Sequence, residues 1–136
     1  MSSSGVLALA EIVLWTHDMD QALGFYRDLL GLEVFSPPEL SIKYLRVAEG
    51  PAGVPMMIVL VPHPEAEGEF PSAKRERVLH HMAFTVDAAH FDDLAQRLTG
   101  AGRELRTGVH PVLENVRTVY VDDPEGNEVE IISPTA

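Results

Sequence analysis

Three side chains that lie far apart in the sequence, Glu11, His81 and Glu130, are of the types that bind metal ions. Two carboxylates and one imidazole supply the oxygen and nitrogen donors that suit Fe(II), Mn, Ni, Co or Zn, with coordination positions left open for water or substrate. A carboxylate in a partly apolar cavity is costly to ionise unless a cation compensates its charge. If the fold brings these three side chains together, they predict a divalent metal site.

Each candidate ligand falls in a segment whose alternation is typical of a β-strand. Residues 7–16, 78–86 and 127–132 each have a more apolar face, which we expect to cover a helix, and a second face that carries the candidate ligand. The second faces hold Glu11, Val13 and Trp15; His81, Ala83 and Thr85; and Glu128, Glu130 and Ile132. The alternation therefore places all three candidates on faces that no helix is expected to cover.

Apolar spacing predicts a helix and three more strands after the first strand of each half. The expected elements are a helix from Asp18 or Asp20 to Gly31 and strands at 32–35, 42–48 and 56–61, then a helix at 89–101 and strands at 103–109, 116–122 and 127–132. A stretch rich in proline, glycine and charge separates the halves and predicts an exposed linker. The two modules therefore span about 7–62 and 78–134, with a linker of about 63–77.

The two halves keep a nearly constant offset. Glu11 and His81 are 70 positions apart, whereas Val59 and Glu130 are 71 apart, and one residue inserted near the second helix accounts for the difference. We interpret the chain as an α+β protein of two tandem βαβββ modules that form an open, eight-stranded, barrel-like sheet around a cavity. Glu11, His81 and Glu130 would then lie at similar depths in that cavity.

Composition excludes several classes of partner. The 136 residues carry a formal net charge of -11, which disfavours nucleic acids and anionic membrane surfaces. Without cysteine there is neither a disulfide nor a thiolate metal site. No apolar run approaches the roughly 18 residues of a membrane-spanning helix, and no signal peptide is apparent, so we expect a cytoplasmic protein.

Three segments resemble the vicinal oxygen chelate superfamily, which includes glyoxalase, bleomycin-resistance proteins, fosfomycin-resistance proteins and extradiol dioxygenases. They are "DMDQALGFYRDLLGLEV" from Asp18, "HHMAFTVD" from His80 and "DPEGNEVEI" from Asp123. The resemblance covers nearly the whole chain and implies metal ligands at Glu11, His81 and Glu130. Val59 stands at the fourth ligand position and cannot bind a metal, so the pattern resembles that of dioxygenase-like and fosfomycin-resistance members.

The resemblance implies a metal-dependent enzyme of the lyase, isomerase or ring-cleaving type, which acts on a small oxygen-chelating substrate and forms a homodimer. Glu11 departs from the histidine that many members have, and it could instead pair with an arginine or act as a general base, with Glu130 as the other catalytic carboxylate. His81 could be a hydrogen-bonded core residue. The alternative function is metal-free binding of a drug or metabolite, as in bleomycin-resistance proteins, or a structural role in a degenerate member.

Further residues complete the expected site. The pocket lining is predicted to include Val13, Trp15, Met57 and Val59, with His110 and Arg117 as candidates for binding a substrate anion. His80 is expected to pack toward the helix, although a register slip of one residue would let it replace His81. The "DPEG" sequence predicts a type I turn that begins at Asp123.

Overall fold

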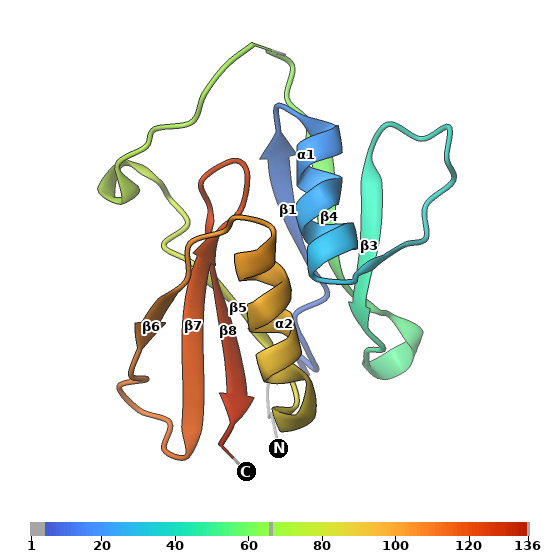
Figure 1. Cartoon of the computed structure of the whole chain (residues 1–136). Helices are drawn as coiled ribbons and strands as arrows, with labels where there is room; N and C mark the ends of the chain where they lie inside the picture. The colour runs from blue at the N-terminus through green and yellow to red at the C-terminus, as the bar shows by residue number, and fades with distance from the viewer. Residues whose placement is uncertain (1–4, 66, 136) are drawn as a thin grey trace. The chain divides into compact units, whose positions relative to one another are not determined.

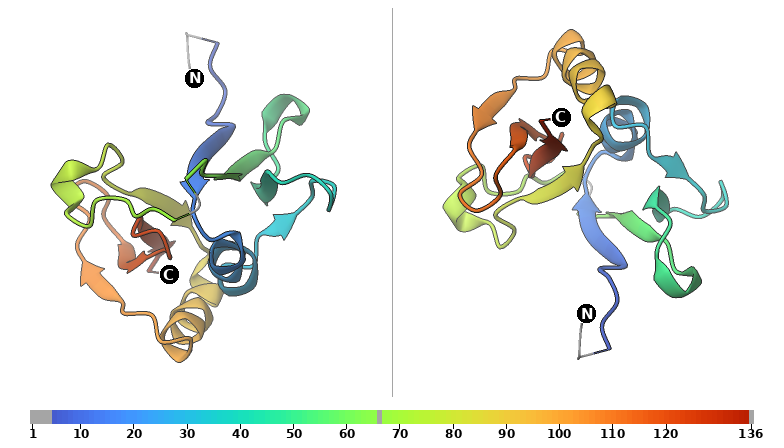
Figure 2. Two further views of the ribbon diagram at one scale, coloured as in Figure 1. Left: turned by 90° about the horizontal axis from the view of Figure 1, so that it is seen from above. Right: turned by 90° about the horizontal axis from the view of Figure 1, so that it is seen from below.

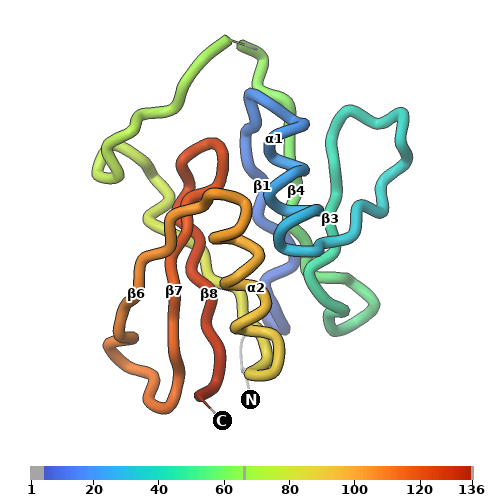
Figure 3. The backbone as a smooth tube through the Cα atoms, viewed as in Figure 1, coloured from blue at the N-terminus to red at the C-terminus, as the bar shows by residue number. Residues whose placement is uncertain are grey.

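The computed structural model describes residues 5–65 and 67–135, and the chain divides after Gly68 into two compact units. Each unit contains one four-stranded mixed sheet with helical segments, which confirms the α+β class. The order strand, helix, strand, strand, strand occurs once in each unit and can be followed along the tube in Figure 3. Among the described residues, no helix has both the length and the apolar character needed to cross a bilayer.

The first unit has strand order β1-β4-β3-β2, with β1 parallel to β4 and the other pairs antiparallel. Its elements are β1 (Glu11–Thr16), α1 (Met19–Leu23), a π-helical continuation (Gly24–Leu29), β2 (Glu33–Val34), β3 (Lys43–Ala48), a short 3-10 helix (Pro51–Gly53) and β4 (Met56–Pro62). The expected helix is therefore present, although its second half is wound as a π-helix, which the sequence pattern did not indicate. Asp18 caps it by accepting a hydrogen bond from the backbone nitrogen of Gln21.

The second unit repeats this topology with order β5-β8-β7-β6, in which β5 runs parallel to β8. Its elements are a short 3-10 helix (Lys74–Glu76), β5 (Met82–Thr85), α2 (Ala88–Gly100), β6 (Arg106–Gly108), β7 (Val116–Asp122) and β8 (Glu128–Pro134). Asp87 caps α2, which packs along one face of its sheet (Figure 1). The segment that leads into β5 lies on the opposite side of β7 and β8 from α2 (Figure 2).

The apolar core of the second unit lies between α2 and its sheet. The buried side chains are Phe91, Leu94 and Leu98 from α2, with Val119, Val121, Val129 and Ile131 from β7 and β8. Alternation along β8 therefore directs Val129 and Ile131 toward the helix, as the pattern predicted, and turns Glu128 and Glu130 to the opposite face.

Two strands begin later than expected because of their partners. β1 starts at Glu11, not at Leu7, and β5 starts at Met82, not at Val78. Each is an edge strand whose neighbour, β4 or β8, itself begins at that level, with Glu11 paired to Met57 and Met82 to Val129. The Ala10 carbonyl still accepts a hydrogen bond from the Met57 nitrogen, but among the described residues no ladder pair precedes Glu11 or Met82 in either strand, so an apolar, alternating sequence does not become a strand there.

A buried carboxylate organises the turn between β7 and β8. Asp123 is 4% exposed, and its Oδ1 accepts hydrogen bonds from the backbone nitrogens of Glu125 (2.9 Å) and Asn127 (2.8 Å). The backbone nitrogen of Gly126 also donates to the carbonyl of Asp123, and Gly126 has φ +82°. Arg77 reaches this turn from the segment before β5 and donates to the Glu125 carbonyl at 2.7 Å.

Gly126→Ala is expected to lower the free energy of unfolding by about 1–2 kcal/mol, because alanine is strained at positive φ. The new Cβ would also lie 2.6 Å from Nη2 of Arg77 and disturb its bond to the turn. Gly24→Ala is the matched control, since Gly24 has a helical φ of -57° and an added methyl group would meet no atom within 4 Å beyond its own helix. Urea denaturation of the two variants measures the difference, and equal stabilities would contradict the strain argument.

Candidate active site

Glu130 is the most deeply buried carboxylate that faces away from α2. It lies in the middle of the sheet, where β8 pairs it with Ala83 of β5 and Tyr120 of β7, and it is 3% exposed. Its Oε1 is 3.1 Å from Nε2 of His81, and its Oε2 accepts a hydrogen bond of 3.2 Å from the hydroxyl of Tyr120. One buried carboxylate therefore has an imidazole and a phenol as its polar partners.

Tyr120 acts on Glu130 as a neutral donor. Burial raises the pKa of the Tyr120 phenol, and the negative charge of Glu130 raises it further. A phenol that keeps its proton continues to donate to the carboxylate across the neutral pH range. The ring of Tyr120 also meets the His81 ring edge-on, with 6.0 Å between centroids.

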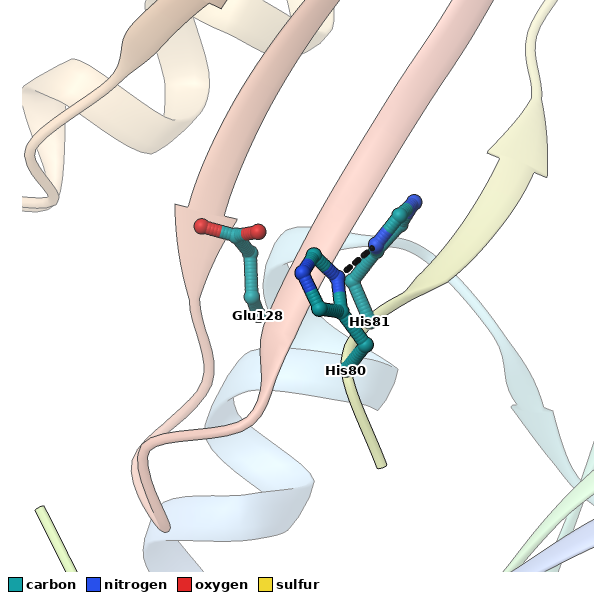
Figure 4. A group of neighbouring side chains, drawn as sticks. All are labelled: His80, His81 and Glu128. Atoms are coloured by element: carbon teal, nitrogen blue, oxygen red, sulfur yellow. Dashed lines mark hydrogen bonds between the residues drawn. The ribbon is translucent and has the colours of Figure 1, made fainter. Parts of the chain in front are cut away.

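His80 and His81 directly precede β5 in the sequence, and their side chains contact each other. Their Nδ1 atoms are 2.8 Å apart, and the two rings turn toward each other (Figure 4). His80 is exposed, so the expectation that it packs toward the helix is wrong. Because β5 begins at Met82, the strand alternation does not extend back to His80 and cannot direct its side chain to the core.

Glu128 has different neighbours from Glu130, although both lie on the same face of β8. It forms ion pairs with Lys74 and with Arg106, the latter at 3.0 Å, and Arg106 also pairs with Asp122 at 2.8 Å. Burial acts to raise the pKa of Glu128, but the hydrogen bonds and charges of Lys74 and Arg106 outweigh it and hold the pKa below its usual value. A cavity of about 170 Å³ opens beside this cluster, lined also by Arg77 and His80.

Beside the start of β5, two sets of donors among the described residues could hold a metal ion. His81 and Glu130 form one, and His80, His81 and Glu128 form the other, with ligand atoms within 4.8 Å of one another. In the second set Glu128 is already neutralised by two cationic side chains, which would repel a metal ion. The first set has no lysine or arginine bound to its carboxylate among the described residues, and it is the better candidate.

The predicted site residues of the first unit lie on one face of its sheet. Glu11 is exposed at the start of β1 beside Met57, and Val13 lies beside Val59. Val13 and Trp15 are each half exposed, whereas Val59 is buried. These residues share a face of β1 and β4, as the alternation predicted, and His81 and Glu130 share a face in the other unit.

His110 and Arg117 have local structural partners. Nδ1 of His110 accepts hydrogen bonds from the backbone nitrogens of Val112 and Leu113, which fixes the loop between β6 and β7. Arg117 lies on the helix side of the sheet, where its guanidinium stacks 4.0 Å from the Phe91 ring centroid and pairs with Asp92 at 3.1 Å. Neither residue contacts Glu130, so we do not include them in the proposed site.

Sequence reasoning missed Tyr120, Lys74 and Arg106. The sequence could have indicated that Tyr120 lies beside Glu130. A hairpin turn that begins at Asp123 pairs residue 122 with 128 and therefore residue 120 with 130. Lys74 gave no such signal, since it belongs to a segment that was expected to be an exposed linker. Its ion pair with Glu128 joins residues 54 positions apart, and no local pattern indicates such a contact.

Comparisons with known proteins bear on the family and the fold of the chain. The family model described as Glyoxalase/Bleomycin resistance protein/Dioxygenase superfamily matches residues 8–131. No curated protein sequence matches the chain significantly. Solved structures do match it, and because their identities are below 25% they establish the fold alone.

Three of these structures illustrate the range. A glyoxalase/dioxygenase from Nostoc punctiforme is 22% identical with a TM-score of 0.70, covering 98% of this chain and 95% of that one. The fosfomycin resistance protein FosX from Listeria monocytogenes is 18% identical with a TM-score of 0.66, covering 96% and 95%. An integron cassette protein from the Halifax Harbour sewage outfall metagenome is 20% identical with a TM-score of 0.67, covering 94% and 99%.

The lowered pKa of Glu128 predicts a pH-dependent contribution to stability. Its ion pairs stabilise the fold fully above the ordinary carboxyl pKa, and this stabilisation is lost as the pH falls through the lowered folded-state pKa. Glu128→Gln should therefore cost about 1 kcal/mol at neutral pH and progressively less in acid. Urea unfolding across the acid range measures this, with the exposed Glu104→Gln as control; a cost that does not shrink in acid would contradict the assignment.

Proposed function

Because the chain belongs to the glyoxalase/bleomycin resistance protein/dioxygenase superfamily, we propose that it is a metal-dependent enzyme that acts on a small substrate with adjacent oxygen atoms. The observation that carries the proposal is the environment of Glu130. This carboxylate is almost fully buried, and its described partners are one imidazole and one phenol. Such a group needs compensation of its charge, and a divalent cation beside a neutral imidazole supplies it.

The donors fit a divalent metal ion. His81 offers Nε2 and Glu130 offers Oε1, two atoms that already face each other at 3.1 Å. A nitrogen and a carboxylate oxygen suit Fe(II), Mn, Ni, Co or Zn. The proposal takes Glu11 as the third ligand on the basis of the family resemblance, with positions left open for substrate.

Each side chain has a role in the proposed reaction. The bound cation would supply Lewis acidity toward the substrate oxygens. Tyr120 donates to Oε2 of Glu130, so that Oε1, which faces Nε2 of His81, would bind the ion. Glu11 would take up a proton from the substrate if it does not act as a ligand. Val13 and Trp15, exposed on the same face of β1 as Glu11, would contact the apolar part of the substrate.

A metal-free binding protein is the second candidate. It is favoured by the two hydrogen bonds that Glu130 accepts, because a buried carboxylate with two donors can be accommodated without an ion. Both candidates predict a small-molecule ligand, and they differ in whether Glu130 binds a cation.

Metal binding distinguishes the two. Protein purified without chelators should contain a divalent ion or bind one in calorimetric titrations with Mn²⁺, Co²⁺, Ni²⁺ and Zn²⁺, with Fe²⁺ tested under anaerobic conditions. Glu130→Gln keeps the size of the side chain but removes its charge, and it should weaken binding by about 100-fold, the upper end of the range of about 10–100-fold that even supporting groups of metal sites contribute. Glu11→Gln should also weaken binding.

Glu128→Gln is the matched control, since it makes the same change two residues away on the same face of β8. Its affinity should stay close to that of the unmodified protein. An unmodified protein that binds none of these ions would refute the enzyme proposal and favour the metal-free candidate. Loss of binding in Glu128→Gln, with Glu130→Gln unaffected, would assign the ion to the other donor set.

A further inference from the structure

We propose that His80 is a positioning residue for His81: it holds the His81 ring so that Nε2 faces Glu130 and can bind the cation. The inference rests on the proposed function and goes beyond it. His81 has a polar partner at each ring nitrogen, with Nδ1 2.8 Å from His80 and Nε2 3.1 Å from Glu130. The ring is therefore held at both ends along a line from an exposed histidine to a buried carboxylate.

The backbone alone does not fix this ring. His80 and His81 precede β5, and neither takes part in the ladder with β8. The χ2 torsion of histidine has broad minima, so a ring at the end of a strand needs a side-chain partner to keep one orientation. His81 keeps 33% of its side chain exposed, and the Tyr120 ring and His80 both contact it, His80 through the polar atom Nδ1.

Metal-binding histidines commonly donate their second ring N–H to a carboxylate, carbonyl or water, which fixes the tautomer. At His81 this partner is another imidazole, which in its neutral form can either donate or accept a hydrogen bond. A carboxylate could only accept. The difference matters because His81 would have to change tautomer on binding a cation. An imidazole partner can keep its hydrogen bond to Nδ1 of His81 in either tautomer.

The proton balance follows from the two contacts. With both rings neutral and no ion, Nε2–H of His81 would donate to the Glu130 carboxylate, and Nδ1 of His81 would accept from Nδ1–H of His80. If Nε2 of His81 held a cation, its proton would go to water, and the Nδ1 proton of His80 would pass to Nδ1 of His81. His80 would then take a proton from water at its own Nε2. Both rings would stay neutral, and the hydrogen bond between them would persist with its direction reversed.

His80 could alternatively be a ligand itself, together with His81 and Glu128. The charges around Glu128 disfavour that arrangement, because Lys74 and Arg106 already pair with it. The facing Nδ1 atoms of the two rings also form a hydrogen bond, which uses the lone pair that one of them would need for an ion.

A matched pair of variants tests the positioning role. In His80→Asn the amide places a polar atom near the position of the imidazole Nδ1 and can donate or accept, whereas His80→Leu has nearly the same shape and can do neither. We expect His80→Asn to bind Zn²⁺ and Co²⁺ with affinity close to that of the unmodified protein. His80→Leu should bind about 10–100-fold more weakly, the loss typical of removing a partner of a metal-binding histidine. His90→Leu, at an exposed position on α2, is the control for loss of a surface imidazole.

The tautomer provides a readout that is independent of activity. In ¹⁵N NMR spectra of the full chain, His81 should carry its proton on Nε2 without metal and on Nδ1 with Zn²⁺. In the Zn²⁺ form, the Nδ1–H of His81 should exchange slowly with water in the unmodified protein and in His80→Asn. In His80→Leu it should exchange rapidly.

The outcomes separate this inference from the proposed function. An unmodified protein that binds no ion would refute the proposed function. Metal binding that is unchanged in His80→Leu would overturn only the role of His80. Equal losses in His80→Asn and His80→Leu, together with a loss in Glu128→Gln, would make His80 a ligand and overturn the positioning role. Near-normal metal affinity in His80→Asn, together with weakened affinity in His80→Leu, supports the positioning role.

Discussion

The register of the β7–β8 hairpin is the constraint on which the second unit depends. The buried carboxylate of Asp123 binds two backbone nitrogens of the turn and so fixes where the chain reverses. From that point the antiparallel ladder pairs Tyr120 with Glu130. A shift of one residue would turn Glu130 toward α2 and place Val129 on the polar face. The phenol, the carboxylate and the apolar core therefore all depend on one turn.

Two glutamates two residues apart on one face show how environment separates chemical roles. Glu128 lies near the edge of the face and is neutralised by Lys74 and Arg106, which hold its pKa low. Glu130 lies one step deeper, with an imidazole and a phenol as partners. Only Glu130 has no lysine or arginine as a partner among the described residues. That difference is why we propose Glu130, and not Glu128, as the metal ligand.

The segment before β5 contributes more than a connection. Lys74 pairs with Glu128, and Arg77 binds the carbonyl of Glu125, so the segment is attached to the face of the sheet opposite α2. It ends at His80, whose ring meets that of His81. Residues expected to form an exposed linker thus border the proposed site. Similarity to solved structures below 25% identity establishes the fold, whereas these contacts belong to this chain.

The sequence by itself determined the elements, the repeat and the faces of the central strands, because periodicity, capping residues and turn chemistry act locally. It was sufficient to place Glu130 on the face opposite the helix and to predict that His81 lies near it. Tertiary structure decided where the edge strands begin, because an edge strand extends only as far as its partner, and this moved His80 out of the core. It also decided which glutamate is neutralised, because the ion pair of Lys74 with Glu128 joins distant parts of the chain that no local pattern relates.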